Sequence, residues 1–175
     1  KTASKITVKD RSKERQEKAH CHYITVDPTQ QYVFVVDLGI DKILSYDLKN
    51  LLSDKKEEVI SKVAFSTRPG SGPRHMLFNS CSDNKFAYLL NELDSTVSAL
   101  SYNSLAGTFV EVQTISTLPN DYDNCKLNFC SAIRISNDGK FLYASNRGHN
   151  SIVVYKIDID SGKLTNIQYE FTNGE

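Results

Sequence analysis

One six-residue pattern occurs three times in the chain, as Tyr32-Val-Phe-Val-Val-Asp37, Phe86-Ala-Tyr-Leu-Leu-Asn91 and Phe141-Leu-Tyr-Ala-Ser-Asn146. Each copy has aromatic residues at its first and third positions and ends in Asp or Asn. The copies are evenly spaced, because Asn91 follows Asp37 by 54 residues and Asn146 follows Asn91 by 55. Self-similarity at a fixed period of this length is typical of propellers and other repeat architectures.

Each copy belongs to a longer series of short alternating segments separated by turn residues. Ile43, Val97 and Ile152 stand six residues after the Asp or Asn and begin a further apolar, alternating stretch. Period-two alternation of Tyr, Phe, Val and Ile indicates strands. We therefore expect four strands in each repeat: first strands at about 22–26, 74–78 and 131–135, second strands at 32–37, 86–91 and 141–146, third strands at 43–48, 97–102 and 152–157, and fourth strands at 60–66, 109–115 and 164–171.

Four antiparallel strands recurring at a fixed period predict an all-β fold, namely a β-propeller of four-stranded blades. The expected units are a basic N-terminal segment at 1–19, which could be the outer strand of a preceding blade, and blade units at 20–70, 71–120 and 121–175. A propeller needs about four blades to close. We therefore expect either a central fragment of a longer, seven-bladed ring or a protomer that closes by self-association, with two apolar blade faces left without a neighbour.

One stretch of the first repeat fits two structures. Its apolar residues from Leu48 to Val63 could share one face of a helix. We expect a strand from Ile60 preceded by a charged loop at 55–58, because the repeat requires a strand there. A short helical turn near 49–57 is the alternative.

The composition is that of a soluble globular protein, and it excludes several classes of function. Lys+Arg and Asp+Glu both number 21, so no overall charge favours nucleic acid or an acidic membrane, although residues 1–19 hold seven basic and three acidic groups. No apolar run approaches the roughly 18 residues of a membrane helix. The cysteines form no CxxC pair, so we expect free thiols in a cytoplasmic protein, with the last two in an irregular loop between blades: Cys21, Cys81, Cys125 and Cys130.

Chemistry-bearing residues recur at one end of each predicted blade. The first and second strands form a hairpin, so the start of one lies beside the end of the other. The first strands start at His22, Arg74 and Ser131, with His20 and His75 adjacent, and the residues just after the second strands are Leu38, Glu92 and Arg147. If the first strands line the channel, a histidine, two arginines and a glutamate meet at one end of it. Such a set could bind an anion and move protons.

Several motifs, in order, also resemble the lactonase-type seven-bladed β-propellers, which include 6-phosphogluconolactonases and a carboxy-muconate lactonizing enzyme. The similarity runs from about Gln16 to Gly174 and corresponds to the middle of the family's chain. It rests on His20-Cys-His22, Asp37-Leu-Gly39, Gly70-Ser-Gly-Pro-Arg-His75, Asn91-Glu-Leu93 and Ser145-Asn-Arg-Gly-His149.

This resemblance implies roles for four residues. His22 aligns with the family's proposed catalytic histidine and Glu92 with its proposed acid/base carboxylate. Arg74 and Arg147 align with the arginines thought to bind the anionic groups of the substrate, and His75, adjacent to Arg74, is placed with them. The chain departs from the family at Ser131-Ala132-Ile133, where Ala132 replaces an acidic residue. The implied substrate is a small anionic lactone of carbohydrate metabolism in the pentose phosphate pathway.

Each of these residues also has a purely structural interpretation. His22 could be a hydrogen-bonded histidine at a strand end, and Glu92 and Arg147 could form a structural pair between blades. His20 and His22 share a strand face, but no third ligand follows from the spacing, so we expect neither a metal nor a cofactor. The functional alternatives are a lactone hydrolase, a carboxy-muconate lactonizing enzyme, and a catalytically silent propeller that serves as a binding scaffold.

Overall fold

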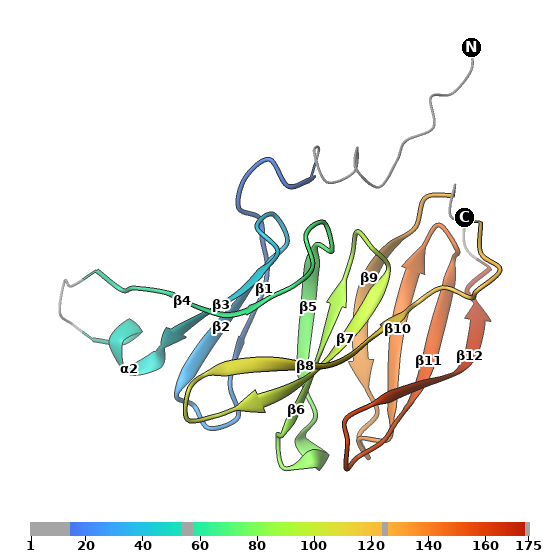
Figure 1. The fold of residues 1–175 in the computed structure, drawn as a ribbon. Helices are drawn as coiled ribbons and strands as arrows, with labels where there is room; N and C mark the ends of the chain where they lie inside the picture. Colours follow the sequence, from blue (N-terminus) through green and yellow to red (C-terminus); the bar gives the residue numbers. More distant parts are fainter. Residues whose placement is uncertain (1–14, 54–57, 124–125, 174–175) are drawn as a thin grey trace.

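The computed structural model describes residues 15–53, 58–123 and 126–173, and these form three four-stranded antiparallel sheets. The sheets stand side by side as three blades, and apolar clusters between their faces join each blade to the next (Figure 1). All twelve predicted strands are present. No helix within the described residues is long and apolar enough to cross a membrane.

Blade 1 has the strand order β1-β2-β3-β4, each strand pairing with the next along the chain. Its strands are β1 (Cys21–Val26), β2 (Tyr32–Asp37), β3 (Lys42–Asp47) and β4 (Lys62–Ser66). The ambiguous stretch contains both expected features. A one-turn helix, α2 (Leu48–Leu51), begins where the Asp47 carboxylate accepts a hydrogen bond from the Asn50 amide at 3.0 Å. The fourth strand begins at Lys62 rather than Ile60, and the expected loop at 55–57 lies outside the described residues.

Blades 2 and 3 repeat this plan. Blade 2 contains β5 (Pro73–Phe78), β6 (Phe86–Asn91), β7 (Thr96–Asn103) and β8 (Thr108–Ser116), with a short 3-10 helix η1 (Ser80–Ser82) between β5 and β6. Blade 3 contains β9 (Phe129–Ile135), β10 (Phe141–Arg147), β11 (Ser151–Ile157) and β12 (Leu164–Phe171).

The expectation that Cys130 lies in an irregular loop is wrong. Cys130 is the second residue of β9 and is fully buried, because β9 starts two residues earlier than its alternating pattern indicates. Its Sγ lies 3.2 Å from the Thr117 hydroxyl. Cys125 lies outside the described residues. The three described cysteines are free thiols, as expected: Cys21, Cys81 and Cys130.

Aromatic residues of the second strands of blades 1 and 2 pack against the following blade. Phe34 and Phe86 each belong to one of the two buried clusters between successive blades. The turn glycines of the next blade make room for these rings. A Cβ on Gly107 would lie 2.8 Å from the Tyr32 ring, and one on Gly162 would lie 2.4 Å from the Phe86 ring. The same contact thus joins blade 1 to blade 2 and blade 2 to blade 3.

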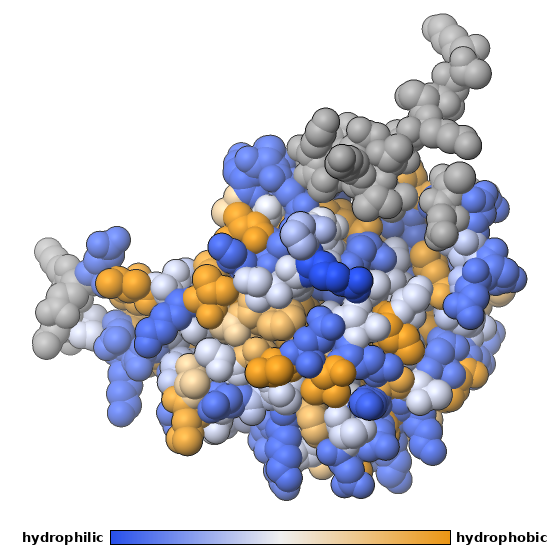
Figure 2. Space-filling view, in the orientation of Figure 1, coloured by the Kyte–Doolittle hydropathy of each residue, from blue (hydrophilic) through white to orange (hydrophobic). Residues whose placement is uncertain are grey.

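The two outer blade faces carry exposed apolar side chains. On blade 1, Ile24 is 66% exposed and Val63 is 50% exposed; on blade 3, Tyr143 and Ile167 are exposed as well. Tyr143 occupies the position that Phe34 and Tyr88 fill with buried rings in the other blades, so the blade sequence provides for a neighbour on this face. On the face of the molecule in Figure 2, hydrophobic and hydrophilic side chains are interspersed. Whether copies of the chain associate through the outer faces stays a prediction.

Candidate functional site

A β-bulge interrupts the pairing at the start of every first strand. The register shifts between Cys21 and Tyr23 in blade 1, and between Pro73 and His75 in blade 2. His22 and Arg74 are therefore the bulged residues. In blade 3 the shift lies between Ala144 and Asn146 of β10, opposite Ser131 and Ala132. Bulges aim a side chain away from the regular pleat and are frequent next to active sites. The sequence pattern predicted the strands but not the bulges.

The turn that follows each second strand lies against the chain that enters the same blade. Glu92 donates its amide to the Gly72 carbonyl at 2.7 Å, and Leu38 donates its amide to the His20 carbonyl at 2.9 Å. The approach is close enough to require glycine, since a Cβ on Gly39 would lie 1.8 Å from the Lys18 carbonyl oxygen. In blade 2 the turn carries Leu93 instead, and the glycine is in the entering segment, at Gly72. These contacts hold the bulges and turns together at one end of the blades.

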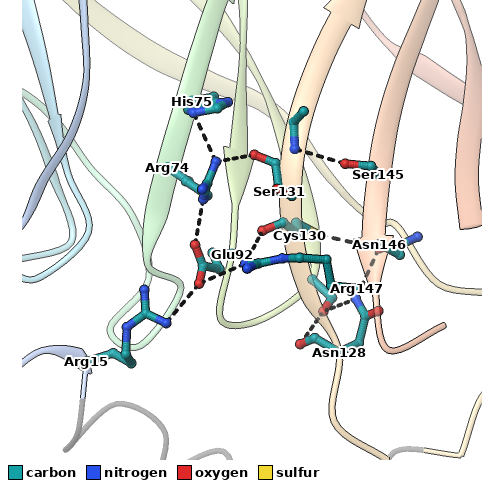
Figure 3. Close-up of polar contacts among 12 residues, drawn as sticks. Arg15, Arg74, His75, Glu92, Asn128, Cys130, Ser131, Ser145, Asn146 and Arg147 are labelled. Carbon is teal, nitrogen blue, oxygen red and sulfur yellow. Dashed lines mark hydrogen bonds and ion pairs between the residues drawn. The ribbon is translucent and has the colours of Figure 1, made fainter. Parts of the chain in front are cut away.

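Glu92 is at the centre of the site (Figure 3). Its side chain is 1% exposed and lies among three guanidinium groups. Arg74 Nε donates a hydrogen bond to Oε2 at 2.7 Å, whereas Nη1 of Arg15 and Nη2 of Arg147 each lie 3.2 Å from Oε1. Three positive charges against one carboxylate leave a local excess of two. The arrangement can therefore attract an anion.

Arg74 is committed mainly to acceptors of the protein. Besides Glu92, its Nη1 contacts the Ser131 carbonyl and lies 3.0 Å from Nε2 of His75. A guanidinium group has no acceptor, so His75 Nε2 must accept this bond and the proton must be on Nδ1. That Nδ1 is buried without a hydrogen-bond partner in the described part of the chain. Burial and the nearby Arg74 lower the pKa of His75 to about 4, so a neutral His75 orients Arg74.

His22 lies near this cluster in a half-buried position on its bulge. Burial and the positive charges of Arg74 and Arg15 lower its pKa, and Glu92 opposes that shift. A neutral imidazole can accept a proton, as a general base must. The neighbouring His20 is turned to another partner, because its Nε2 lies 3.0 Å from Glu17. The described residues contain no group of three or more His, Cys, Asp or Glu side chains placed to hold a metal ion.

Arg15 is the residue that sequence reasoning missed. It belongs to the basic N-terminal segment at 1–19, for which no role in the site is expected, yet its guanidinium contacts Glu92 of blade 2. The residues that follow Arg15 are anchored on the β2–β3 turn: Gln16 Nε2 donates to the Leu38 carbonyl at 2.7 Å and to the Asp41 carboxylate at 2.8 Å. Nothing in local periodicity distinguishes Arg15 from the other basic residues around it. The only sequence signal is its position beside Gln16, where the family resemblance begins.

The remaining positions of the predicted set have structural partners. Arg147 is 52% exposed and also donates from Nη2 to the Cys130 carbonyl at 3.2 Å. His149 lies beside it, and its Nδ1 is 2.6 Å from the Ser151 hydroxyl. Ala132 donates its amide to the Ser145 hydroxyl at 3.0 Å, so no acidic group enters the site from this position. Leu38, the counterpart of Glu92 in blade 1, is fully buried and apolar.

Comparison with known proteins shows the family of the chain. The family model described as lactonase, 7-bladed beta-propeller matches residues 1–175. The chain belongs to this family. Its all-β architecture of four-stranded blades is thereby confirmed as a propeller architecture, as the repeat predicts.

Individual relatives agree with this assignment. The chain is 42% identical over 162 residues to a 6-phosphogluconolactonase of Bacillus subtilis, which covers 92% of this chain and 43% of that protein. It superimposes on a periplasmic gluconolactonase of Pseudomonas aeruginosa with a TM-score of 0.82 and 30% identity, covering 99% of this chain and 46% of the other. A putative 6-phosphogluconolactonase of Bacteroides fragilis gives a TM-score of 0.78 at 35% identity, covering 91% and 44%. The chain thus spans somewhat less than half the length of these relatives.

Proposed function

We propose that the protein is a lactone hydrolase that acts on a small anionic lactone, with 6-phosphogluconolactone as the leading substrate. The observation that carries this proposal is the buried Glu92 carboxylate among three arginines, with a histidine of lowered pKa beside them. The site combines an excess of positive charge with a group able to accept a proton. The similarity to a 6-phosphogluconolactonase supports the choice of substrate.

In this mechanism His22 is the general base. The attacking water gives its proton to the neutral imidazole as its oxygen adds to the lactone carbonyl. Negative charge then develops on the carbonyl oxygen, and the excess positive charge around Glu92 stabilises it. Ring opening follows when the tetrahedral intermediate collapses and the ring oxygen takes up a proton, which His22 can return.

Glu92 fits the role of orienting groups rather than donating a proton. Both oxygens of its carboxylate are in contact with guanidinium groups, so protonation of the leaving oxygen is better assigned to His22. Glu92 holds Arg74 through the 2.7 Å bond and keeps the arginines from repelling one another. His75 supports Arg74 from its other side instead of contacting the substrate.

An assay of acid release tests the proposal. The protein as its source makes it should open 6-phosphogluconolactone well above the spontaneous rate, followed by base uptake at constant pH. His22→Gln and Glu92→Gln should each lower kcat by about 100-fold or more. Lys140→Gln, in the β9–β10 turn at the other end of blade 3 and paired with Asp138, is the control. Undiminished turnover by both site variants would refute the mechanism.

Two further outcomes separate this function from its alternatives. Loss of absorbance from a carboxylated muconate would identify a lactonizing enzyme, and the absence of both reactions would favour a binding scaffold.

Localisation in the cytoplasm rests on the free cysteines and stays a prediction, since the gluconolactonase of Pseudomonas aeruginosa is periplasmic.

A further inference from the structure

The three arginines around Glu92 differ in how many of their donors the protein itself uses. Arg74 is 18% exposed, and its Nε and Nη1 contact Glu92, His75 and the Ser131 carbonyl. Arg15 is 42% exposed and Arg147 is 52% exposed. A guanidinium group has five N–H donors. The two exposed arginines therefore retain donors that face outward, and Arg74 retains few.

Arg15 and Arg147 also share a single oxygen atom. Each places one guanidinium nitrogen 3.2 Å from Oε1 of Glu92. Although that oxygen is buried, neither contact has the geometry of a hydrogen bond. Because both nitrogens contact the same atom, they are close enough for one phosphate group to bridge them. The two groups are thus held near Glu92 by charge, Arg147 also by its bond to the Cys130 carbonyl, and their remaining donors can bind a second anion.

The chain fixes Arg15 at this place through the residues that follow it. Gln16 is bonded to Leu38 and Asp41, and the His20 amide donates to the Asp37 carboxylate at 2.7 Å. Lys18 passes so close to Gly39 that no side chain fits between them. An arginine held by such an anchor has lost much of its freedom before a ligand arrives, which lowers the entropic cost of binding.

We infer that Arg15 and Arg147 together form a subsite for the phosphate group of a phosphorylated lactone, so that Arg15 determines the preference for phosphorylated over unphosphorylated substrates. This inference rests on the proposed function. The local excess of two positive charges matches a phosphate monoester, which carries about −1.5 to −2 near neutral pH. A neutral sugar lactone would leave that excess uncompensated.

The test compares two substrates in the protein as its source makes it. Arg15→Gln should raise KM for 6-phosphogluconolactone about tenfold, the effect of one charge-assisted hydrogen bond. The ratio of its KM for 6-phosphogluconolactone to its KM for glucono-δ-lactone should therefore rise, because only the phosphorylated substrate uses the subsite. Arg15→Lys should recover part of the loss, because the charge remains although the two-pronged geometry does not. Lys140→Gln, which removes one positive charge away from the site, should leave both substrates unaffected.

Binding of inorganic phosphate, measured by calorimetry, separates this inference from the proposed function. Weaker phosphate binding by Arg15→Gln in a protein without lactonase activity would support the subsite and refute the hydrolase. Equal KM ratios and equal phosphate affinities in Arg15→Gln and the unchanged protein would refute the subsite. A loss of kcat on both substrates without a change of KM would also refute it, since Arg15 would then act only through Glu92.

Discussion

The β2–β3 turn of blade 1 and the β6–β7 turn of blade 2 share one backbone plan but differ in the residues they carry. Each begins at an acidic or amide side chain, Asp37 or Asn91, and each has a residue of positive φ four positions later, Asp41 at 56° and Ser95 at 56°. The residue after the strand is Leu38 in the first turn and Glu92 in the second. Both are buried, at 0% and 1% exposure.

The difference separates what the fold requires from what the site requires. A buried leucine satisfies the position without any partner. A buried carboxylate is tolerated only because arginines from two blades and from the segment before β1 surround it. The repeat therefore supplies the scaffold, and the residues in which one blade departs from the others supply the chemistry.

The largest effect on stability is expected when the charged turn is made like the apolar one. Glu92→Leu would leave three arginines without their shared carboxylate, and we expect the free energy of unfolding to fall by about 3 kcal/mol. Urea denaturation measures this change in the free energy of unfolding. The matched control is Asp138→Asn, which also removes a carboxylate paired with a cation but on the exposed surface, and it should leave stability nearly unchanged. Similar values for the two variants would contradict a structural role for the cluster.

The glycine at the contact between turn and entering segment gives a second comparison, because it lies in the turn in blade 1 and in the entering segment in blade 2. In blade 2 a Cβ on Gly72 would lie 2.5 Å from the Leu93 side chain, whereas in blade 1 a Cβ on Gly39 would meet backbone. We expect Gly72→Ala to cost about 2 kcal/mol, and about half of that to disappear in a Leu93→Ala background, because a side chain can be removed. The remainder is strain at the positive φ of residue 72. Additive effects in this double-mutant cycle would show that the clash is relieved elsewhere.

Sequence reasoning predicted most of the fold, because a propeller blade repeats and its strands alternate. The twelve strands and the packing of Phe34 and Phe86 follow from periodicity. The start of β9 and the burial of Cys130 do not, since irregular sequence precedes that strand. Tyr143 is exposed only because blade 3 is the last of the three blades, so no described blade covers this face.

The site was predicted in part. Spacing alone brings Arg74, Glu92 and Arg147 to one end of the blades, where the structure joins them by ion pairs. Their roles in catalysis stay proposals. Two features had no periodic signal: the bulges that carry His22 and Arg74, and the contact of Arg15 with Glu92. Both depend on residues far apart in sequence, so tertiary structure is needed to find them.

The pH dependence of stability offers a third and smaller effect, to which His75 of blade 2 contributes most. The pKa of His75 is lowered to about 4, so between its unfolded value near 6.5 and about 4 the unfolded chain binds more protons than the folded one. Stability should therefore fall as the pH drops through this range, by about 1–2 kcal/mol from His75 after allowance for solvent screening. Urea denaturation between pH 7 and pH 4.5 measures this slope.

His75→Gln should flatten the slope, because its amide oxygen can accept the bond from Arg74 without titrating. Part of the slope should remain, since burial lowers the pKa values of His22 and His149 in the same direction. An unchanged slope would mean that His75 takes up its proton without losing Arg74.

The smallest expected effect comes from the last residue of each turn. Asp41 accepts hydrogen bonds from the amides of Gly70 and Gly72 and from Gln16, each at 2.8 Å, whereas the Ser95 hydroxyl accepts one from Asn128 at 3.0 Å. Asn tolerates a positive φ, so Asp41→Asn tests the carboxylate alone and should cost about 1 kcal/mol. Ser95→Gly should cost less, because relief of the positive φ offsets part of the loss of its two hydrogen bonds with Asn128. Ser95→Gly could instead prove the more costly of the two. The contact between blades 2 and 3 would then depend more on the β6–β7 turn than the contact between blades 1 and 2 depends on the β2–β3 turn. The bond from Gln16 to Asp41 would then hold Arg15 in the site less firmly than its length of 2.8 Å indicates.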